Sequence, residues 1–184
     1  MKLIDIADVM IGVLTKRENN KNGENSYSLF SLKNYEEEIG FEEFKTNKNL
    51  DSKVTKKGDL LFRLLHPNKI IYVDEKLDGT LIPSQFCIIR PNKKQINPIV
   101  LKWYLESNNA TNELNSKVTG SIIKSMSVAN LKTLNIPYIL IEKQEDMKNL
   151  ILLWEREKEI YKEILEEKGK LYNSYLEKMI IEGK

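Results

Sequence analysis

Residues 144–181 read QEDMKNLILLWEREKEIYKEILEEKGKLYNSYLEKMII, a stretch without proline and with a single glycine, Gly169. Apolar side chains recur in it every three or four residues between glutamates and lysines, which is the period of an amphipathic helix. At 1.5 Å per residue this helix is about 57 Å long, well beyond the diameter of a domain formed by residues 1–141. We therefore expect the helix to need a partner.

The heptad pattern of this helix is broken. Its two seam positions hold Met147, Trp154, Tyr161 and Tyr175, and Leu150, Ile164 and Leu171, and the seam is interrupted at Glu157, Lys168 and Lys178. Further apolar residues flank the seam, which favours packing against more than one neighbour over a self-sufficient zipper. The predicted dimer or partner interface consists of Leu150, Trp154, Tyr161, Ile164, Leu165, Leu171 and Tyr175. The alternative is a helix that lies back on its own domain.

Composition indicates a soluble and mostly globular chain, with 41% hydrophobic and 30% charged residues in 184. No apolar run approaches 18 residues, so no membrane span is expected. The first ten residues, MKLIDIADVM, carry acids where a signal peptide carries bases. A single cysteine, Cys87, excludes an internal disulfide or a cysteine zinc site, and His66 is the only histidine. These features predict a cytoplasmic protein.

Charge divides unevenly along the chain. Residues 1–141 carry 20 Lys and Arg against 16 Asp and Glu, a net charge of +4. Residues 142–184 carry 9 against 11, a net charge of −2, and the two parts give the total of +2. A mildly basic body permits nucleic-acid binding without requiring it.

Residues 56–90 alternate short apolar runs with turn signals. Lys56-Lys57-Gly58-Asp59 predicts a turn before a buried strand at 60–65, and further strands are predicted at 70–73 and 81–90. Shorter signals predict a strand at 27–32, helices after Pro98 and at 110–116, and a capped turn at 127–134. The predicted fold class is α+β: a mixed β-sheet domain at 1–141, then a long helical arm at 142–184 that pairs as a coiled coil.

The order of these pieces resembles a known family. Between Thr119 and Gln144 the chain has Thr-Gly-Ser, Ile123-Lys124, Ser127, Leu131, Leu134, Asn135-Ile136-Pro137 and Gln144 before the long helix. Upstream it has Lys57-Gly58-Asp59-Leu60-Leu61-Phe62, and Pro83-Ser84-Gln85 before Ile88-Ile89-Arg90. Together these segments resemble the DNA specificity subunits of type I restriction–modification enzymes, with a target recognition domain before the helix.

The resemblance implies a non-catalytic DNA-recognition subunit. Members of that family usually carry two recognition domains and two long helices, whereas this chain has one of each, so it resembles a half-subunit that pairs with a second copy. The implied partners are double-stranded DNA, a second copy of the chain, methyltransferase subunits and restriction subunits. No cofactor is implied in this chain; S-adenosylmethionine, ATP and magnesium are expected on the partner subunits.

Polar loops supply the candidate DNA contacts. A Thr-Gly-Ser turn lets backbone NH groups approach phosphate closely, and lysine and serine beside it add donors. Arginine, lysine and asparagine in loops suit base edges or phosphates. The predicted DNA-binding residues are Lys16, Arg17, Lys21, Lys56, Lys57, Arg63, Lys69, Thr119, Gly120, Ser121, Lys124 and Ser125. For each lysine the competing interpretation is plain solvation.

Enzymatic alternatives find little support in the sequence. Asn135-Ile136-Pro137-Tyr138 differs from the Asn-Pro-Pro-Tyr loop of amino-methyltransferases at its second position, and no glycine pair suits a methyl donor. Glu43-Phe44-Lys45 matches a nuclease pattern that chance supplies in a charged chain. Two non-enzymatic alternatives stay open, a coiled-coil interaction protein without DNA function and a sequence-independent basic DNA binder.

Overall fold

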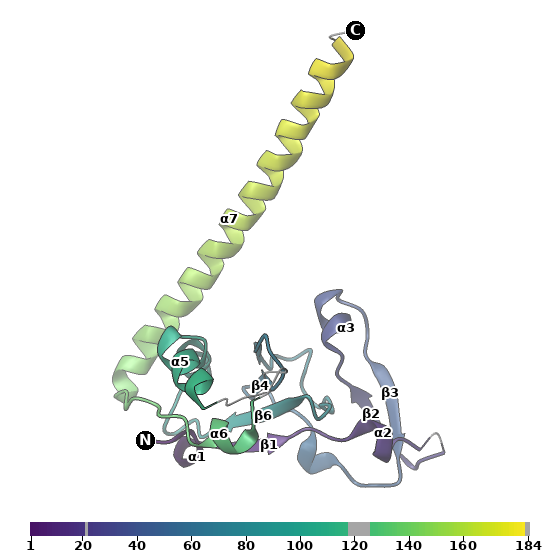
Figure 1. Cartoon of the computed structure of the whole chain (residues 1–184), viewed down its shortest axis with the longest axis vertical. Helices are drawn as coiled ribbons and strands as arrows, with labels where there is room; N and C mark the ends of the chain where they lie inside the picture. The colour runs from purple at the N-terminus through teal and green to yellow at the C-terminus, as the bar shows by residue number, and fades with distance from the viewer. Residues whose placement is uncertain (21, 118–125, 183–184) are drawn as a thin grey trace. The chain divides into compact units, whose positions relative to one another are not determined.

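The computed structural model describes residues 1–20, 22–117 and 126–182. The chain divides into two compact units, Met1–Gln144 and Glu145–Lys184. The first unit combines antiparallel sheets with short helices, and the second continues a long helix (Figure 1). The predicted α+β class with a long C-terminal helix is therefore confirmed.

A four-stranded sheet forms the centre of the first unit. Its strands are β1 (Ala7–Ile11), β6 (Phe86–Pro91), β4 (Leu60–Arg63) and β5 (Ile70–Tyr72), in that order across the sheet. Every neighbouring pair is antiparallel, with Val9 opposite Ile89 and Leu61 opposite both Ile88 and Ile71. We expected a mixed sheet, but parallel contact among the described residues is limited to isolated bridges. Apolar runs predict buried strands and do not reveal strand direction.

A separate hairpin pairs β2 (Asn25–Leu29) with β3 (Glu42–Thr46), again antiparallel. Helix α3 (Leu32–Glu36) lies between these strands in the chain, and the Ser31 hydroxyl caps it by accepting a hydrogen bond from the Asn34 NH. The strand expected at 27–32 therefore ends early, because the cap turns the chain into a helix.

The core of the first unit lies between these sheets and the connections that cross them. One cluster gathers around Phe30, Phe86 and Ile88, with Phe30 and Phe86 in edge-to-face contact at 5.2 Å. A second cluster forms around Phe44 and Leu81. Leu81 and Ile82 are fully buried, yet β6 begins only at Phe86, because the backbone at 81–82 bonds instead to Ser28, Phe30 and Val13.

Short helices complete the first unit. They are α1 (Leu3–Ile6), α2 (Thr15–Glu18), the 3-10 turn η1 (Asp51–Lys53), α4 (Pro98–Leu105), α5 (Asn108–Ser116) and α6 (Val128–Lys132). Pro98 occupies the first turn of α4, as expected, and the Asn97 side chain caps that helix through the Ile99 NH at 2.9 Å. Ser107 and Ser127 cap α5 and α6 in the same way.

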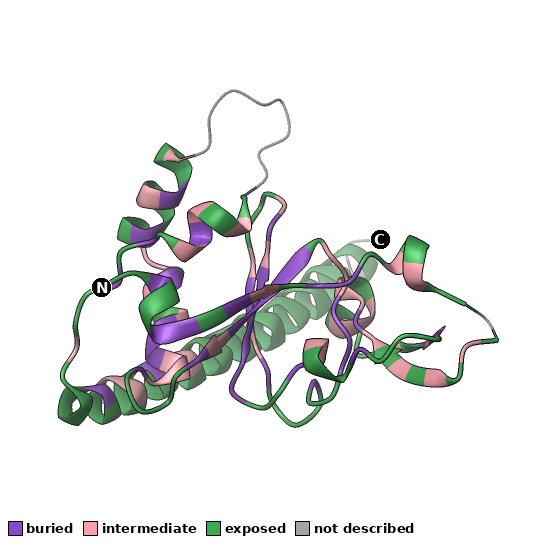
Figure 2. Cartoon of the chain, turned by 90° about the horizontal axis from the view of Figure 1, so that it is seen from below, coloured by how far each residue is buried: buried purple, intermediate pink, exposed green. Residues whose placement is uncertain are grey.

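Helix α7 (Ile141–Glu182) has 42 residues and carries most of the large exposed apolar side chains among the described residues. Its length is about 63 Å at 1.5 Å per residue. Figure 2 shows it as exposed over nearly its whole course, in contrast to the strands, where buried residues concentrate. No helix among the described residues is both long enough and apolar enough to cross a membrane.

Candidate nucleic-acid interface

The first predicted contact region is the loop that begins with α2. Lys16 and Arg17 are exposed there, and the loop is held to β3 by a hydrogen bond from the Asn20 NH to the Lys45 carbonyl at 2.8 Å. Lys48 adds an ion pair to Glu18 at 3.4 Å. The third predicted residue of this loop, Lys21, lies outside the described residues. Lys16 and Arg17 are therefore exposed to solvent on a loop that is hydrogen-bonded to β3.

The second region is the predicted turn at residues 56–59. Gly58 has φ of +95°, a left-handed conformation that glycine adopts without strain, so the turn signature is confirmed. Lys56 and Lys57 are exposed on it. The Lys57 ammonium is bound to Glu75 at 2.6 Å, and this hydrogen bond raises the pKa of Lys57 and lowers the pKa of Glu75.

A second basic turn adjoins the first. Lys93 and Lys94 are exposed on the turn that follows β6, and the Lys93 Nζ donates to the Lys57 carbonyl at 3.3 Å. Neither lysine is among the DNA-binding residues predicted from the sequence. The signal was present, since a Lys-Lys pair follows Pro91-Asn92, but their neighbour in space is 36 residues away.

The third region is the hairpin between β4 and β5. Arg63 and Lys69 are half-buried at its base, where the Arg63 NH donates to the Lys69 carbonyl at 2.8 Å. The Lys69 ammonium pairs with Glu36 at 2.5 Å. The hairpin borders a hollow of about 380 Å³ whose other wall is formed by α4 and α5. Lys69 is thus already neutralised in part, whereas Arg63 has no such pair among the described residues.

The predicted phosphate turn, Thr119, Gly120, Ser121, Lys124 and Ser125, lies outside the described residues. Its flanks are fixed. On one side Lys117 bonds to Glu113 at 2.7 Å and its carbonyl accepts from the Asn130 side chain at 3.1 Å. On the other side the Met126 NH donates to the Leu64 carbonyl at 2.8 Å, directly after Arg63.

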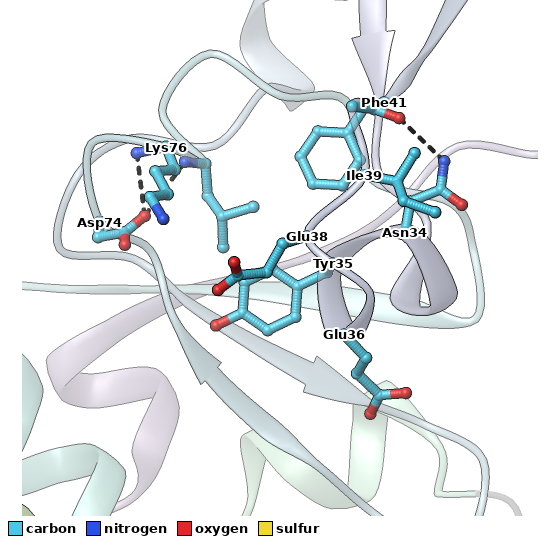
Figure 3. Close-up of a pocket in the computed structure, with 10 residues that line it drawn as sticks. Asn34, Tyr35, Glu36, Glu38, Ile39, Phe41, Asp74 and Lys76 are labelled. Atoms are coloured by element: carbon cyan, nitrogen blue, oxygen red, sulfur yellow. Dashed lines mark hydrogen bonds between the residues drawn. The ribbon is translucent and has the colours of Figure 1, made fainter.

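One hollow of the first unit is lined mainly by acidic and aromatic side chains. This hollow of about 530 Å³, next to α3, is lined by Glu36, Glu38 and Asp74 together with Tyr35 and Phe41. Figure 3 shows Asp74 and Lys76 on one side of this hollow and Ile39 and Phe41 on the other. Burial raises the pKa of the Tyr35 phenol, and the Asp74 carboxylate raises it further. Lys76 also lines the hollow and Glu36 pairs with Lys69, and the remaining carboxylates disfavour the binding of phosphate here.

A partly buried ion pair stabilises the turn at residues 56–59. Arg90 on β6 donates to both carboxylate oxygens of Asp59, at 2.7 and 2.9 Å, and its bonds to Asp59 raise the pKa of the guanidinium. The Asp59 side chain is 3% exposed and also accepts from the Lys56 NH at 2.8 Å. The pair thus fixes the backbone that carries Lys56 and Lys57.

The predicted partner interface on α7 is exposed in this chain. Leu150 and Leu165 are 68% and 72% exposed, and Trp154, Tyr161, Ile164, Leu171 and Tyr175 are exposed as well. The Lys158 ammonium lies 3.4 Å from the centre of the Trp154 ring. An apolar stripe of this extent is unusual on a surface that stays in water.

Comparison with known proteins gives the fold a context. No protein-family model matches the sequence, and no curated protein matches it significantly. Solved structures do match. The crystal structure of the HsdS subunit from Thermoanaerobacter tengcongensis has a TM-score of 0.63 and 22% identity, over 87% of this chain and 43% of that chain.

Two further structures agree. A chain from a study of complex assembly and conformational transition of the type I R-M system has a TM-score of 0.65 and 19% identity, covering 88% of this chain and 43% of that one. The type I restriction-modification S subunit from M. genitalium has a TM-score of 0.56 and 14% identity, covering 85% and 38%. The chain spans less than half the length of these proteins, and over that span it has the fold of type I restriction–modification S subunits.

Proposed function

We propose that this chain recognises a DNA sequence for a type I restriction–modification complex. Residues 1–141 act as the target recognition domain and residues 142–184 as the arm that binds a second copy and the methyltransferase. The observation that carries the proposal is the fold match over 87% of the chain to an HsdS subunit. Exposed cations at Lys16, Arg17 and Lys56 on one unit, and the exposed apolar stripe of α7 on the other, support it.

In this proposal the chain itself is not catalytic. Partner subunits hold S-adenosylmethionine for methylation, and restriction subunits use ATP and magnesium to cleave. Among the described residues, no group of three or more histidine, cysteine or acidic side chains could hold a metal ion. The assembly works in the cytoplasm, where its DNA substrate and cofactors are found.

The decisive experiment is methylome sequencing of cells that carry this chain and its neighbouring methyltransferase gene. The proposal expects methylated adenines at one interrupted motif, which disappear when this chain is deleted. Methylation that persists without the chain contradicts the recognition role. Methylation by the purified chain alone, given S-adenosylmethionine, contradicts the non-catalytic role.

The phosphate turn has its own test. Lys124→Ala should weaken binding to every DNA sequence alike and lower the slope of log K against log salt by about 0.9, the loss of one phosphate contact. Binding that is unchanged would make the Thr119–Ser125 turn structural. Lys132→Ala is the control, because Lys132 lies on α6, outside the predicted contact loops.

A second candidate function is a coiled-coil interaction protein without DNA binding. The exposed apolar stripe of α7 favours it equally, since a partner of any kind could cover that stripe. DNA binding separates the two functions. A chain that pairs through α7 but shows no affinity for DNA, alone or with the methyltransferase, is the interaction protein.

A further inference from the structure

Two basic turns from distant parts of the sequence meet at one place on the first unit. One is the turn at residues 56–59 and the other is the turn that follows β6, at residues 92–96. The Lys93 side chain crosses directly over Gly58: its Cε and Nζ lie 3.0 and 3.1 Å from where a Cβ on Gly58 would stand. The absence of a side chain at Gly58 therefore makes room for Lys93.

Both turns are fastened to the domain. Asp59 and Arg90 lock the first turn, and the Asp78 carboxylate adds a bond to the Lys57 NH at 2.9 Å. In the second turn the Asn92 carbonyl accepts from the NH groups of Gln95 and Ile96, at 2.8 and 3.0 Å. Turns that are fixed in advance lose little conformational entropy when a ligand binds to them.

The lysines of these turns keep most of their charge unpaired. The Asp59 carboxylate forms an ion pair with Arg90, and the Glu75 carboxylate forms one with Lys57. Lys56, Lys93 and Lys94 are exposed, and among the described residues none of them pairs with a carboxylate. Other lysines of the unit do have glutamate partners: Lys33 with Glu37 at 3.9 Å, Lys45 with Glu43 at 3.4 Å and Lys102 with Glu106 at 3.1 Å.

We propose that Lys56, Lys93 and Lys94 form a phosphate-binding site for the backbone of duplex DNA. This inference rests on the proposed function, which supplies DNA as the polyanion, and it adds two residues that the sequence resemblance did not indicate. Three exposed ammonium groups on two fixed turns suit the phosphate backbone, because lysine binds phosphate as a compact point charge and has no planar fork of donors like that of arginine. The site therefore positions DNA without reading its sequence.

The test compares two triple variants with the same change in charge. Lys56→Ala/Lys93→Ala/Lys94→Ala removes the site, and Lys33→Ala/Lys45→Ala/Lys102→Ala removes three lysines that have glutamate partners. Fluorescence anisotropy measures binding of the full chain, with its methyltransferase partner, to a random-sequence 30-bp duplex between about 50 and 200 mM salt. We expect the first variant to lower the salt slope by about 2–3 and the affinity on the order of 100-fold. The control should change the slope by less than about 1.

Equal slopes for the two variants overturn the site. Replacing the same three lysines by arginine should restore the wild-type slope, because the charge is kept, and melting temperatures within a few degrees of wild type verify that each variant is folded. Inorganic phosphate at millimolar concentration and constant ionic strength should not displace the duplex, because the duplex gains from several phosphate contacts and the release of their counterions at once, and a single phosphate does not. Displacement by millimolar phosphate would make this a small-anion site and overturn the DNA assignment.

Sequence selectivity is scored separately, as the affinity ratio between the methylated motif and a scrambled duplex. If the site is correct, the first triple variant weakens both duplexes and keeps their ratio. A variant that changes the ratio overturns the proposed role, because the lysines would then read bases. A wild-type ratio of one, with the salt slope still lowered in the variant, overturns the proposed function and leaves the phosphate site supported.

Discussion

At the scale of single residues, the Arg90–Asp59 ion pair holds the backbone of the turn that carries the exposed Lys56 and Lys57. Asp59 is buried, and its carboxylate is satisfied by Arg90 and by the NH of Lys56. Removing one member of a buried pair leaves an uncompensated charge, which costs far more than the pair itself contributes. The exposed lysines on the turn therefore depend on an arginine that DNA does not need to touch.

Arg90→Ala should lower the free energy of unfolding by about 3–5 kcal/mol. Chemical denaturation of the full chain measures it, with Lys33→Ala as the control. Lys33 forms an exposed pair with Glu37 at 3.9 Å, and such pairs are worth at most about 1 kcal/mol. A loss below about 1 kcal/mol for Arg90→Ala would mean that water reaches Asp59 and that the turn is not fixed by this pair.

Cys87 provides a residue-scale test of the core. It lies fully buried on β6, and burial raises the pKa of its thiol to about 12 from an ordinary value of 9.0. The thiolate is the reactive form, so a maleimide or disulfide reagent at pH 8 should label Cys87 only at the rate of unfolding. Rapid labelling of the native chain would contradict the packing of β6.

The raised pKa of the Cys87 thiol makes the free energy of unfolding depend on pH. Above pH 9 the unfolded chain releases the thiol proton while the folded chain retains it, so the folded state binds more protons and stability falls as pH rises from about 9 to 12. Below pH 9 the thiol is protonated in both states and contributes no slope. Cys87→Ala should remove this part of the alkaline loss, which denaturation curves at pH 8 and 10 can measure.

At the scale of elements, Gln144 explains why the first turn of α7 belongs to the domain. Its side chain is 4% exposed, accepts from the Asn97 NH at 2.7 Å and donates to the carbonyls of Gln95 and Ile139, at 3.0 and 2.8 Å. Every polar atom of the amide is thus used. The sequence resemblance includes this glutamine, and the structure supplies a physical reason for its presence before the helix.

The exposed stripe of α7 predicts self-association. Burying one large apolar side chain contributes roughly 1.5–3 kcal/mol, so several such residues on each copy can hold a dimer. Wild-type chain at tens of micromolar should sediment as a dimer, and Trp154→Glu/Ile164→Glu should sediment as a monomer with an unchanged melting temperature for the domain. Glu155→Gln/Glu166→Gln is a control that changes charge without touching the stripe. A wild-type chain that stays monomeric contradicts pairing through α7.

At the scale of the whole molecule, the sequence predicts what depends on local pattern. The α7 period, the Pro98 start of α4 and the Gly58 turn are each set by residues close together in the chain, and all are confirmed. Long-range pairing is different. No local signal joins Lys57 to Glu75, Lys69 to Glu36 or Lys93 to the turn at 56–59. The sequence therefore indicates basic loops but does not distinguish neutralised cations from unpaired ones.

The length of α7 should set the spacer of the DNA target. In the proposed dimer, two identical domains related by a twofold axis read identical half-sites in opposite orientation, so the target is a palindrome around a spacer. Antiparallel pairing, expected from the family arrangement, holds the domains at opposite ends, and the helix length then sets the spacer. Deleting Lys162–Leu165 shortens α7 by about 6 Å, close to two base pairs of DNA.

Methylome sequencing of cells carrying the deletion, with the methyltransferase present, should return the same half-sites around a spacer about two base pairs shorter. Lys162→Ala/Glu163→Ala keeps the helix length and should keep the spacer. Removing four residues also rotates the part of α7 beyond the deletion by about 40°, so the shortened protein can lose activity altogether. Inserting seven residues at the same point nearly preserves the helix phase. If helix length sets the spacer, this insertion should lengthen it. A continuous or asymmetric wild-type motif, or a spacer that ignores both changes in length, contradicts the symmetric dimer, because identical domains on a rigid arm admit neither result.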